Sequence, residues 1–167
     1  SSQRTTFAVE HGATKDEGYA THLLGRGNIL NITAALAIAQ QMGVSIEARR
    51  RGVKQIEQVE HRLSMRTSGG ITILDDAYNS NPTGARMALE VLGGFDTAGA
   101  RYVVTPGFVE MGAKQYDNNR AFGTDIAGSK ADGVIVVNEV NREAITAGLE
   151  AAGYDMARVA TVASFKE

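Results

Sequence analysis

The sequence predicts an α/β protein whose second part is a mostly parallel β-sheet flanked by helices. From Gly70 onward, short apolar runs alternate with segments of helical periodicity, and the links between them are short, which favours repeated strand–helix units. Before Gly70 the pattern differs, because two short polar strands precede two helices. That opening is too small and polar to form a core alone. We therefore expect a boundary between two regions near Thr67 to Gly70.

The first region is expected to begin with two strands and a long helix. The strands are predicted at Thr5 to Val9 and Tyr19 to Leu24, with His11 to Gly18 as the turn between them. A helix from about Ile29 to Met42 follows, because its apolar residues recur at helical spacing and give it one apolar face. Gly43 is well suited to end this helix.

A second helix and an extended segment complete this region. Ser45 is expected to cap the helix, which fades near Val59. The arginines from Arg49 to Arg51 are expected on its solvated side. The alternation of apolar and polar residues from Glu60 to Arg66 predicts a strand or an extended connector.

The second region begins with a stretch that reads strand, polar turn and helix. The apolar run from Ile71 to Leu74 predicts a strand covered on both faces. Pro82 suits the first position of a helix, where its missing N–H is not needed, and Asn81 is then a natural N-cap. The helix is expected to reach Leu92 and to end at Gly93 and Gly94.

Three further strands and two helices follow with short connections. The strands are predicted at Tyr102 to Thr105, Val134 to Val137 and Val159 to Val162, and the helices at Asp117 to Ala127 and Arg142 to Ala152. Such repeated units favour a parallel sheet with its carboxyl ends at one edge. The sheet is expected to continue beyond the last residue of the sequence.

Composition limits the possible partners. The chain has 17 basic and 19 acidic residues and no basic run that stands out, so nucleic acid is not expected as a partner. It has no cysteine, which excludes disulfides and thiolate metal sites. No apolar run approaches the length of a membrane span, and no signal peptide is evident. We therefore expect a cytoplasmic protein that does not bind a membrane.

Polar side chains gather where the strand ending at Leu74 meets the next helix. This cluster consists of Asp75, Asp76, Tyr78, Asn79 and Asn81. In open α/β sheets, ligands bind where the carboxyl end of a strand meets a helix N-terminus. The alternative is that the aspartates and asparagines are only turn and cap residues. The cluster as a whole favours a ligand site, with no metal site assigned to it.

Two asparagines at the start of the first helix are candidates for a base contact. Asn28 and Asn31 stand three residues apart, so both carboxamides project from one side of the helix. A carboxamide offers a donor and an acceptor together, which an adenine edge requires. The alternative is a helix cap and an exposed asparagine. Gly25 and Gly27 do not form a dinucleotide fingerprint, because Leu30 occupies the third glycine position.

Three other polar residues each allow both a functional and a purely structural interpretation. Arg62 could clamp a phosphate or stack on a base, although a lone arginine is more often a surface residue. His61 shows no second ligand nearby, so a catalytic or metal role is not favoured. Glu110, just beyond the strand ending at Thr105, is a candidate polar contact or a solvated loop carboxylate. The sequence contains no phosphate-binding Gly-x-x-x-x-Gly-Lys-Ser/Thr loop.

Five stretches together resemble the Mur ligases, and within them the MurF branch, in order and spacing across nearly the whole chain. They are Leu24–Asn31, Glu60–Leu63, Asp75–Pro82, Thr105–Gly112 and Asn141–Arg142. The stretch Asp-Asp-Ala-Tyr-Asn-Ser-Asn-Pro is the most specific of them. The resemblance implies that residues 1–67 are the end of the family's central ATP-binding domain. Residues 68–167 would be most of its Rossmann-like C-terminal domain.

The resemblance also implies roles for single residues in nucleotide binding. Asn28 and Asn31 match asparagines that hold the adenine, and Arg62 matches an arginine that meets the nucleotide from the interdomain link. Asp76 matches the aspartate that takes the ribose hydroxyls. One departure is visible, because the family usually has His where Gly27 stands here.

Further roles implied by the resemblance concern the reaction and its second substrate. Tyr78 falls where related ligases place a residue near the transferred phosphate or the incoming substrate, which makes it the one possible catalytic residue. Asn79 and Asn81 would face the incoming D-alanyl-D-alanine, and Glu110 is a further candidate for a substrate contact.

The implied activity is ATP-dependent amide formation in peptidoglycan synthesis. ATP with Mg²⁺ would activate the carboxylate of a UDP-MurNAc-tripeptide as an acyl phosphate, which the dipeptide amine attacks. The family's phosphate loop, magnesium carboxylates and muropeptide-binding domain have no counterpart in the sequence, so the chain alone is expected to be inactive. The alternatives are a sister ligase, including the folylpolyglutamate type, or a non-enzymatic nucleotide-binding module.

Overall fold

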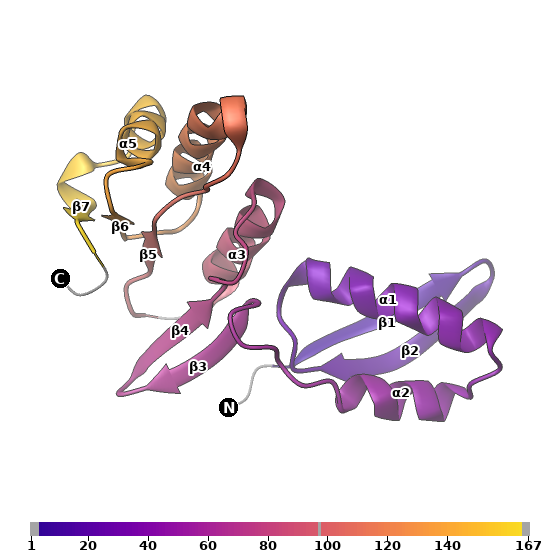
Figure 1. Cartoon of the computed structure of the whole chain (residues 1–167). Coiled ribbons are helices and arrows are strands. Elements are labelled where there is room, and N and C mark those ends of the chain that lie inside the picture. Colours follow the sequence, from indigo (N-terminus) through magenta and orange to yellow (C-terminus); the bar gives the residue numbers. More distant parts are fainter. Residues whose placement is uncertain (1–3, 97, 165–167) are drawn as a thin grey trace. The chain divides into compact units, whose positions relative to one another are not determined.

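The computed structural model describes residues 4–96 and 98–164. It divides into two compact units, Ser1–Tyr78 and Asn79–Glu167, whose elements are labelled in Figure 1. The division falls after Tyr78, whereas the sequence patterns placed a boundary near residue 67. The assignment of residues 1–67 and 68–167 to two family domains stays a prediction. No helix among the described residues is long and apolar enough to span a membrane.

The first unit opens with an antiparallel hairpin of β1 (Thr5–His11) and β2 (Thr14–Thr21). The second strand therefore starts at Thr14, and the expected long turn from His11 to Gly18 is wrong. The reversal takes only two residues, because Gly12 adopts the left-handed conformation with a φ of 58°.

Helix α1 (Gly25–Gln41) covers this hairpin through a small apolar core. Ile32 and Leu36 of α1 are buried together with Tyr19 of β2. The helix begins four residues earlier than expected, so Asn28 lies inside it and is not its cap. The residue at the N-cap position is Leu24, whose side chain makes no capping hydrogen bond.

Helix α2 (Ile46–Lys54) begins at the predicted cap, because the Ser45 hydroxyl accepts a hydrogen bond from the Ala48 N–H. It ends at Lys54, before Val59. The expectation that its arginines are all solvated is wrong. Arg49 Nη1 lies 3.0 Å from Asp16 Oδ2, with the Arg49 side chain only 9% exposed. Arg50 Nε donates to the Glu17 carbonyl at 2.8 Å, so both side chains tie α2 to β2.

The strand after Gly70 differs most from the sequence-based prediction. β4 (Ile71–Asp75) pairs antiparallel with β3 (Ser64–Ser68) in a two-stranded hairpin and is not hydrogen-bonded to the parallel sheet. Gly69 and Gly70 both have positive φ, so the chain reverses within two residues. β4 is not covered on both faces either, because Ile71 is 66% exposed.

The second unit contains the predicted parallel sheet in the order β5-β6-β7. Its strands are β5 (Tyr102–Thr105), β6 (Gly133–Val137) and β7 (Val159–Val162). The fold class is confirmed, with three parallel strands in place of the four expected.

Three helices accompany the sheet in this unit. They are α3 (Pro82–Gly94), α4 (Gln115–Gly128) and α5 (Arg142–Ala151). One-turn 3-10 helices lie at Gly112–Lys114 and Met156–Arg158. Figure 1 shows α4 and α5 side by side.

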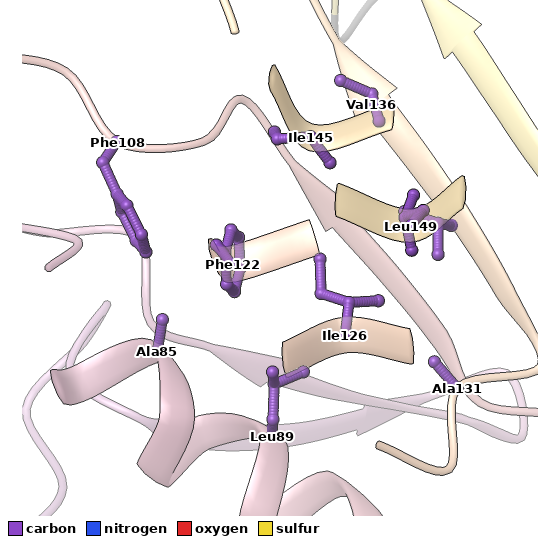
Figure 2. Packing of buried hydrophobic residues seen from close by; sticks show 10 residues of the cluster. Ala85, Leu89, Phe108, Phe122, Ile126, Ala131, Val136, Ile145 and Leu149 are labelled. Atoms are coloured by element: carbon purple, nitrogen blue, oxygen red, sulfur yellow. The ribbon is translucent and has the colours of Figure 1, made fainter. Parts of the chain in front are cut away.

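The core of the second unit forms between these helices and one face of the sheet. Figure 2 shows Phe108 directed toward Ala85 and Phe122, while Ile145 and Leu149 lie near Val136. Phe108 and Phe122 have ring centroids 4.7 Å apart. Because Ala85 and Phe108 share this core, the start of α3 and the chain after β5 lie at the same end of the unit.

Helices α4 and α5 can approach closely because each has a glycine at the crossing. A Cβ on Gly123 would lie 2.2 Å from the Ile145 carbonyl oxygen. A Cβ on Gly148 would lie 2.0 Å from the Arg120 carbonyl oxygen. The two glycines therefore set the separation of the helices that carry much of this core.

Candidate functional site

The base of the β3–β4 hairpin brings together several residues that the sequence analysis singled out. We call this set the linker corner: His61, Arg62 and Leu63 on one segment, and Asp75, Asp76 and Tyr78 on the other. His61 Nδ1 lies 2.9 Å from Asp75 Oδ2. The Leu63 N–H donates to Asp76 Oδ1 at 3.0 Å, and the Tyr78 N–H donates to the His61 carbonyl at 3.0 Å. Three polar contacts therefore hold the two segments together.

A fourth contact joins the two segments through side chains. The Cζ atom of Arg62 lies 4.4 Å from the centroid of the Tyr78 ring, within the range of a cation–π interaction. Both residues are exposed, Tyr78 to 66%. The guanidinium is thus ordered by an aromatic face while it stays accessible to solvent.

The backbone on either side of Arg62 is unusual. His61 has a φ of 60° and Leu63 a φ of 51°, both in the left-handed region that non-glycine residues seldom adopt. Such a conformation persists only where surrounding contacts enforce it, and it clusters at functional sites. The contacts of His61 and Leu63 with the second segment provide that enforcement.

The surroundings of Asp76 change the pKa of its carboxyl group. Partial burial raises the pKa of the Asp76 carboxyl above its ordinary value of 3.8, and the Asp75 charge acts in the same direction. The hydrogen bond from the Leu63 N–H and the charge of Arg62 lower the same pKa, but by less. The bond from Leu63 uses Oδ1, and a ligand hydroxyl could donate to Oδ2.

Gln58 is a positioning residue that the sequence analysis did not identify. Its side-chain N–H donates to the His22 carbonyl at 3.1 Å, and its side-chain oxygen accepts from the Met65 N–H at 3.0 Å. It therefore links β3 to the segment that leads into α1. No local pattern identifies such a residue, because its partners lie 36 and 7 positions away in the chain.

The two predicted adenine contacts lie in the first two turns of α1. Asn28 is half-buried, and its side-chain N–H donates to the Leu24 carbonyl at 2.8 Å. Asn31 is exposed. They are one turn apart and share a side of the helix, as expected from their spacing. Their role in binding a base stays a prediction.

A second candidate region lies after β5 in the other unit. We call residues 106–111 the sheet-edge loop. Asn119 of α4, fully buried, accepts from the Phe108 N–H at 2.7 Å and donates to the Phe108 carbonyl at 2.9 Å. Asn141 donates to the carbonyls of Pro106 and Phe108, both at 2.9 Å. Two buried amides therefore fix the path of this loop.

Gly107 allows this close arrangement. Its φ is 75°, and a Cβ there would lie 2.3 Å from Asn119 Oδ1 and 2.9 Å from Asn141 Cβ. Only glycine fits both the conformation and the space. The Asn119–Asn141 network was not foreseen either, because buried asparagines on two helix-associated segments have no local sequence signal.

The predicted dipeptide contacts lie at this end of the second unit. Glu110 is exposed in the sheet-edge loop with a φ of 61°. Asn79 is exposed just before α3. The Asn81 side-chain oxygen accepts from the Gly84 N–H at 2.9 Å, so its predicted role as the N-cap of α3 is confirmed. Their contacts with a substrate stay predictions.

Among residues 4–96 and 98–164, no group of three or more His, Cys, Asp or Glu side chains is arranged to hold a metal ion.

Comparison with known proteins agrees with these features. The sequence profile of the family described as "Mur ligase, glutamate ligase domain" matches residues 61–167, well over half of the chain. The chain belongs to the Mur ligase family. The matched range contains the whole linker corner and the sheet-edge loop.

Curated relatives include several Mur ligases. The UDP-N-acetylmuramoyl-tripeptide–D-alanyl-D-alanine ligase of Bacillus subtilis is 26% identical over 119 residues, which cover 71% of this chain and 26% of that protein. The UDP-N-acetylmuramate–L-alanine ligase of Brucella anthropi is 29% identical over 160 residues, which cover 89% of this chain and 33% of that protein. The chain thus spans about a quarter to a third of these Mur ligases.

Several solved structures share the fold of this chain. MurF from Acinetobacter baumannii superimposes with a TM-score of 0.78 at 26% identity, covering 95% of this chain and 33% of that one. MurF from Thermotoga maritima in complex with ADP has a TM-score of 0.67 at 24% identity, and the match covers 88% of this chain and 30% of that one. Folylpolyglutamate synthase from Mycobacterium tuberculosis with ADP has a TM-score of 0.65 at 22% identity, and the match covers 91% of this chain and 33% of that one. The resemblance inferred from the sequence is confirmed.

Proposed function

We propose that this chain is the part of an ATP-dependent amide ligase that contacts the nucleoside of ATP and receives D-alanyl-D-alanine for transfer to a UDP-MurNAc-tripeptide. The observation that carries the proposal is the linker corner, where the Arg62 guanidinium and the Asp76 carboxylate are held on adjoining segments. A carboxylate suits ribose hydroxyls, and a guanidinium suits phosphate oxygens. The relatives named as D-alanyl-D-alanine ligases support the choice of the second substrate.

Each group has a separate task in this proposal. Asp76 accepts hydrogen bonds from the ribose through Oδ2, and Arg62 neutralises phosphate charge. Asn28 and Asn31 contact the adenine edge. ATP supplies the phosphoryl group that activates the muropeptide carboxylate, and catalysis consists mainly of positioning and charge neutralisation. The Mg²⁺ expected with ATP has no ligand set among the described side chains, so these residues account for nucleotide contacts alone.

The dipeptide is assigned to the second unit. Asn79 and Asn81 precede α3, and Glu110 lies in the sheet-edge loop at the same end of the unit. Carboxamides can pair with the carboxylate and the amide of a dipeptide, and Glu110 can accept from its ammonium group. A sister reaction with L-alanine as the incoming amine is the second candidate, because the L-alanine ligase match covers 89% of this chain.

Titration of the chain with ADP, D-alanyl-D-alanine and L-alanine tests this assignment. Asp76→Ala is expected to weaken ADP binding about tenfold or more, the loss of a hydrogen bond to a charged group, and to leave dipeptide binding unchanged. Asn81→Ser keeps an oxygen cap for α3 and removes the amide, so it is expected to weaken dipeptide binding alone. Asp117→Ala, which removes an exposed carboxylate of α4, is the matched control.

Two results would contradict the assignment. If Asp76→Ala binds ADP as tightly as the wild type, Asp76 does not contact the ribose. If the chain binds L-alanine more tightly than the dipeptide, the result favours the sister reaction. By itself the chain is expected to show no ATP-dependent ligation, and measurable product from the purified chain would refute that expectation.

A further inference from the structure

The contact between Arg62 and Tyr78 has a geometry with a functional consequence. When a guanidinium stacks on an aromatic ring, it uses its face, and its N–H donors, which lie in the plane of the group, stay free of the ring. The Arg62 Cζ atom lies 4.4 Å from the Tyr78 ring centroid. The nearby carboxylates have other partners, His61 for Asp75 and the Leu63 N–H for Asp76. Among residues 4–96 and 98–164, neither carboxylate pairs with Arg62, so its donors are available to a ligand.

We propose that Tyr78 is a positioning residue whose aromatic ring holds the Arg62 guanidinium ready for the phosphates of a nucleoside diphosphate or triphosphate, and that its phenol hydroxyl takes no part. This inference rests on the proposed function. It replaces the sequence-based expectation that Tyr78 acts directly in catalysis with a role through Arg62.

The backbone supports this role independently of the side chains. The Tyr78 N–H donates to the carbonyl of His61, the residue before Arg62, so the ring and the guanidinium are carried on segments joined at their base. Left-handed conformations at His61 and Leu63 fix the chain on both sides of Arg62. Backbone strain of this kind is maintained where a particular orientation is required.

The exposure of the Tyr78 side chain also supports a positioning role. Tyr78 is 66% exposed, and a ring in that position adds little to a core. A long, flexible arginine on the surface loses rotamer freedom when it binds an anion, and a ring that already restricts it reduces that loss. The ring thus improves affinity for phosphate without touching it.

The experiment compares Tyr78→Phe, Tyr78→Leu and Arg62→Gln in the 167-residue chain, titrated with ADP and with adenosine and followed by NMR. Tyr78→Leu removes the ring, and it is expected to weaken ADP binding about two- to five-fold, the value of an exposed cation–π contact. Tyr78→Phe keeps the ring and is expected to match the wild type. Adenosine affinity is expected to be equal in wild type and Tyr78→Leu, because adenosine has no phosphate for Arg62.

Two controls accompany these variants. Tyr116→Leu removes an exposed ring on α4 and is expected to leave both affinities unchanged. The chemical shifts of the Arg62 side chain report the stacking directly in the absence of a nucleotide. These shifts are expected to change in Tyr78→Leu and to stay close to those of the wild type in Tyr78→Phe. Unchanged signals from the rest of the chain would show that each variant is folded.

The outcomes separate this inference from the proposed function. If the wild type binds ADP and Tyr78→Leu binds it equally well, the positioning role is overturned while the proposed function stands. If Tyr78→Phe is as weak as Tyr78→Leu, the hydroxyl acts directly and the inference is again overturned. If the wild type binds neither ADP nor adenosine, the proposed nucleotide site fails, and the inference that rests on it falls with it.

Discussion

The linker corner lies at the start of β3 and the end of β4, and the sheet-edge loop follows β5. Both carry predicted site residues, but they are held in different ways. Two of the side-chain contacts of the corner are exposed, Arg62 over Tyr78 and His61 against Asp75. The sheet-edge loop depends on Asn119 and Asn141, both buried.

Because the two regions are held differently, substitutions in one should change mainly side-chain orientation, and substitutions in the other should change mainly the stability of the fold. Exposed ion pairs and cation–π contacts each contribute about 1 kcal/mol or less, so changes at the corner should alter side-chain placement more than the free energy of unfolding. Buried polar groups left without partners cost about 1 to 3 kcal/mol each. Substitution of the buried asparagines that hold the sheet-edge loop should therefore lower mainly the free energy of unfolding. Substitutions in the two regions test this contrast.

The largest effect is expected from Asn119→Ala. It leaves the buried Phe108 N–H without its partner, removes one of the two side-chain hydrogen bonds to the Phe108 carbonyl, and removes the bond to the Gln115 carbonyl. The free energy of unfolding should fall by about 3 to 4 kcal/mol because several buried groups lose their hydrogen bonds. Urea unfolding measures it, with Asn118→Ala on the same helix as the control. A loss no greater than that of the control would show that the loop does not depend on the network.

Gly107→Ala should have the next largest effect. The new Cβ would overlap Asn119 Oδ1, and the left-handed backbone would be strained as well. We expect a loss of about 2 to 3 kcal/mol, from strain and steric overlap together. Gly112→Ala is the matched control, because Gly112 also has a positive φ, of 55°, but no atom lies within 4 Å of a Cβ there. Equal losses in urea unfolding for the two variants would mean that the network exerts no steric constraint.

The smallest effect concerns pH and the corner. Burial raises the pKa of Asp76 in the folded chain above its ordinary value of 3.8. The folded state therefore holds this proton more tightly than the unfolded state, and the contribution of Asp76 to stability is greatest below the unfolded pKa. That contribution declines as pH rises through the raised pKa, and is constant above it.

Asp76→Asn removes this titration and keeps an oxygen to accept from the Leu63 N–H. We expect the variant to be slightly more stable than the wild type at neutral pH and to lose part of the decline between acidic and neutral pH. Urea unfolding across that range measures both. Identical pH profiles would show that Asp76 titrates alike in the folded and unfolded chains.

Local patterns predicted the elements that depend on local chemistry. The caps at Ser45 and Asn81 and the strands β5 and β7 were placed from the sequence, because N-caps and short apolar runs act within a few residues. The β3–β4 hairpin was missed, although Gly69 and Gly70 between two extended segments are its usual signal. The apolar run from Ile71 was taken as a buried strand instead.

The rest depends on contacts between distant positions. The pairing of Arg49 with Asp16 and the bridge made by Gln58 join segments more than 30 residues apart. The hydrogen bonds between the Asn119 side chain and the Phe108 backbone form because α4 packs against the sheet-edge loop. Arg62 and Asp76 were recognised as candidates, but their connection through Leu63 and Tyr78 appears only in the folded chain.

The most direct test of a nucleotide site at the linker corner is a map of backbone amide shifts during titration of the chain with ADP. The largest shifts are expected on the linker corner, above all on Leu63, whose N–H is bound to Asp76, and on Tyr78. Smaller shifts are expected at Asn28 and Asn31, and none in the sheet-edge loop. Shifts concentrated in residues 106–111, with the amides of Leu63 and Tyr78 unmoved, would contradict a nucleotide site at the linker corner.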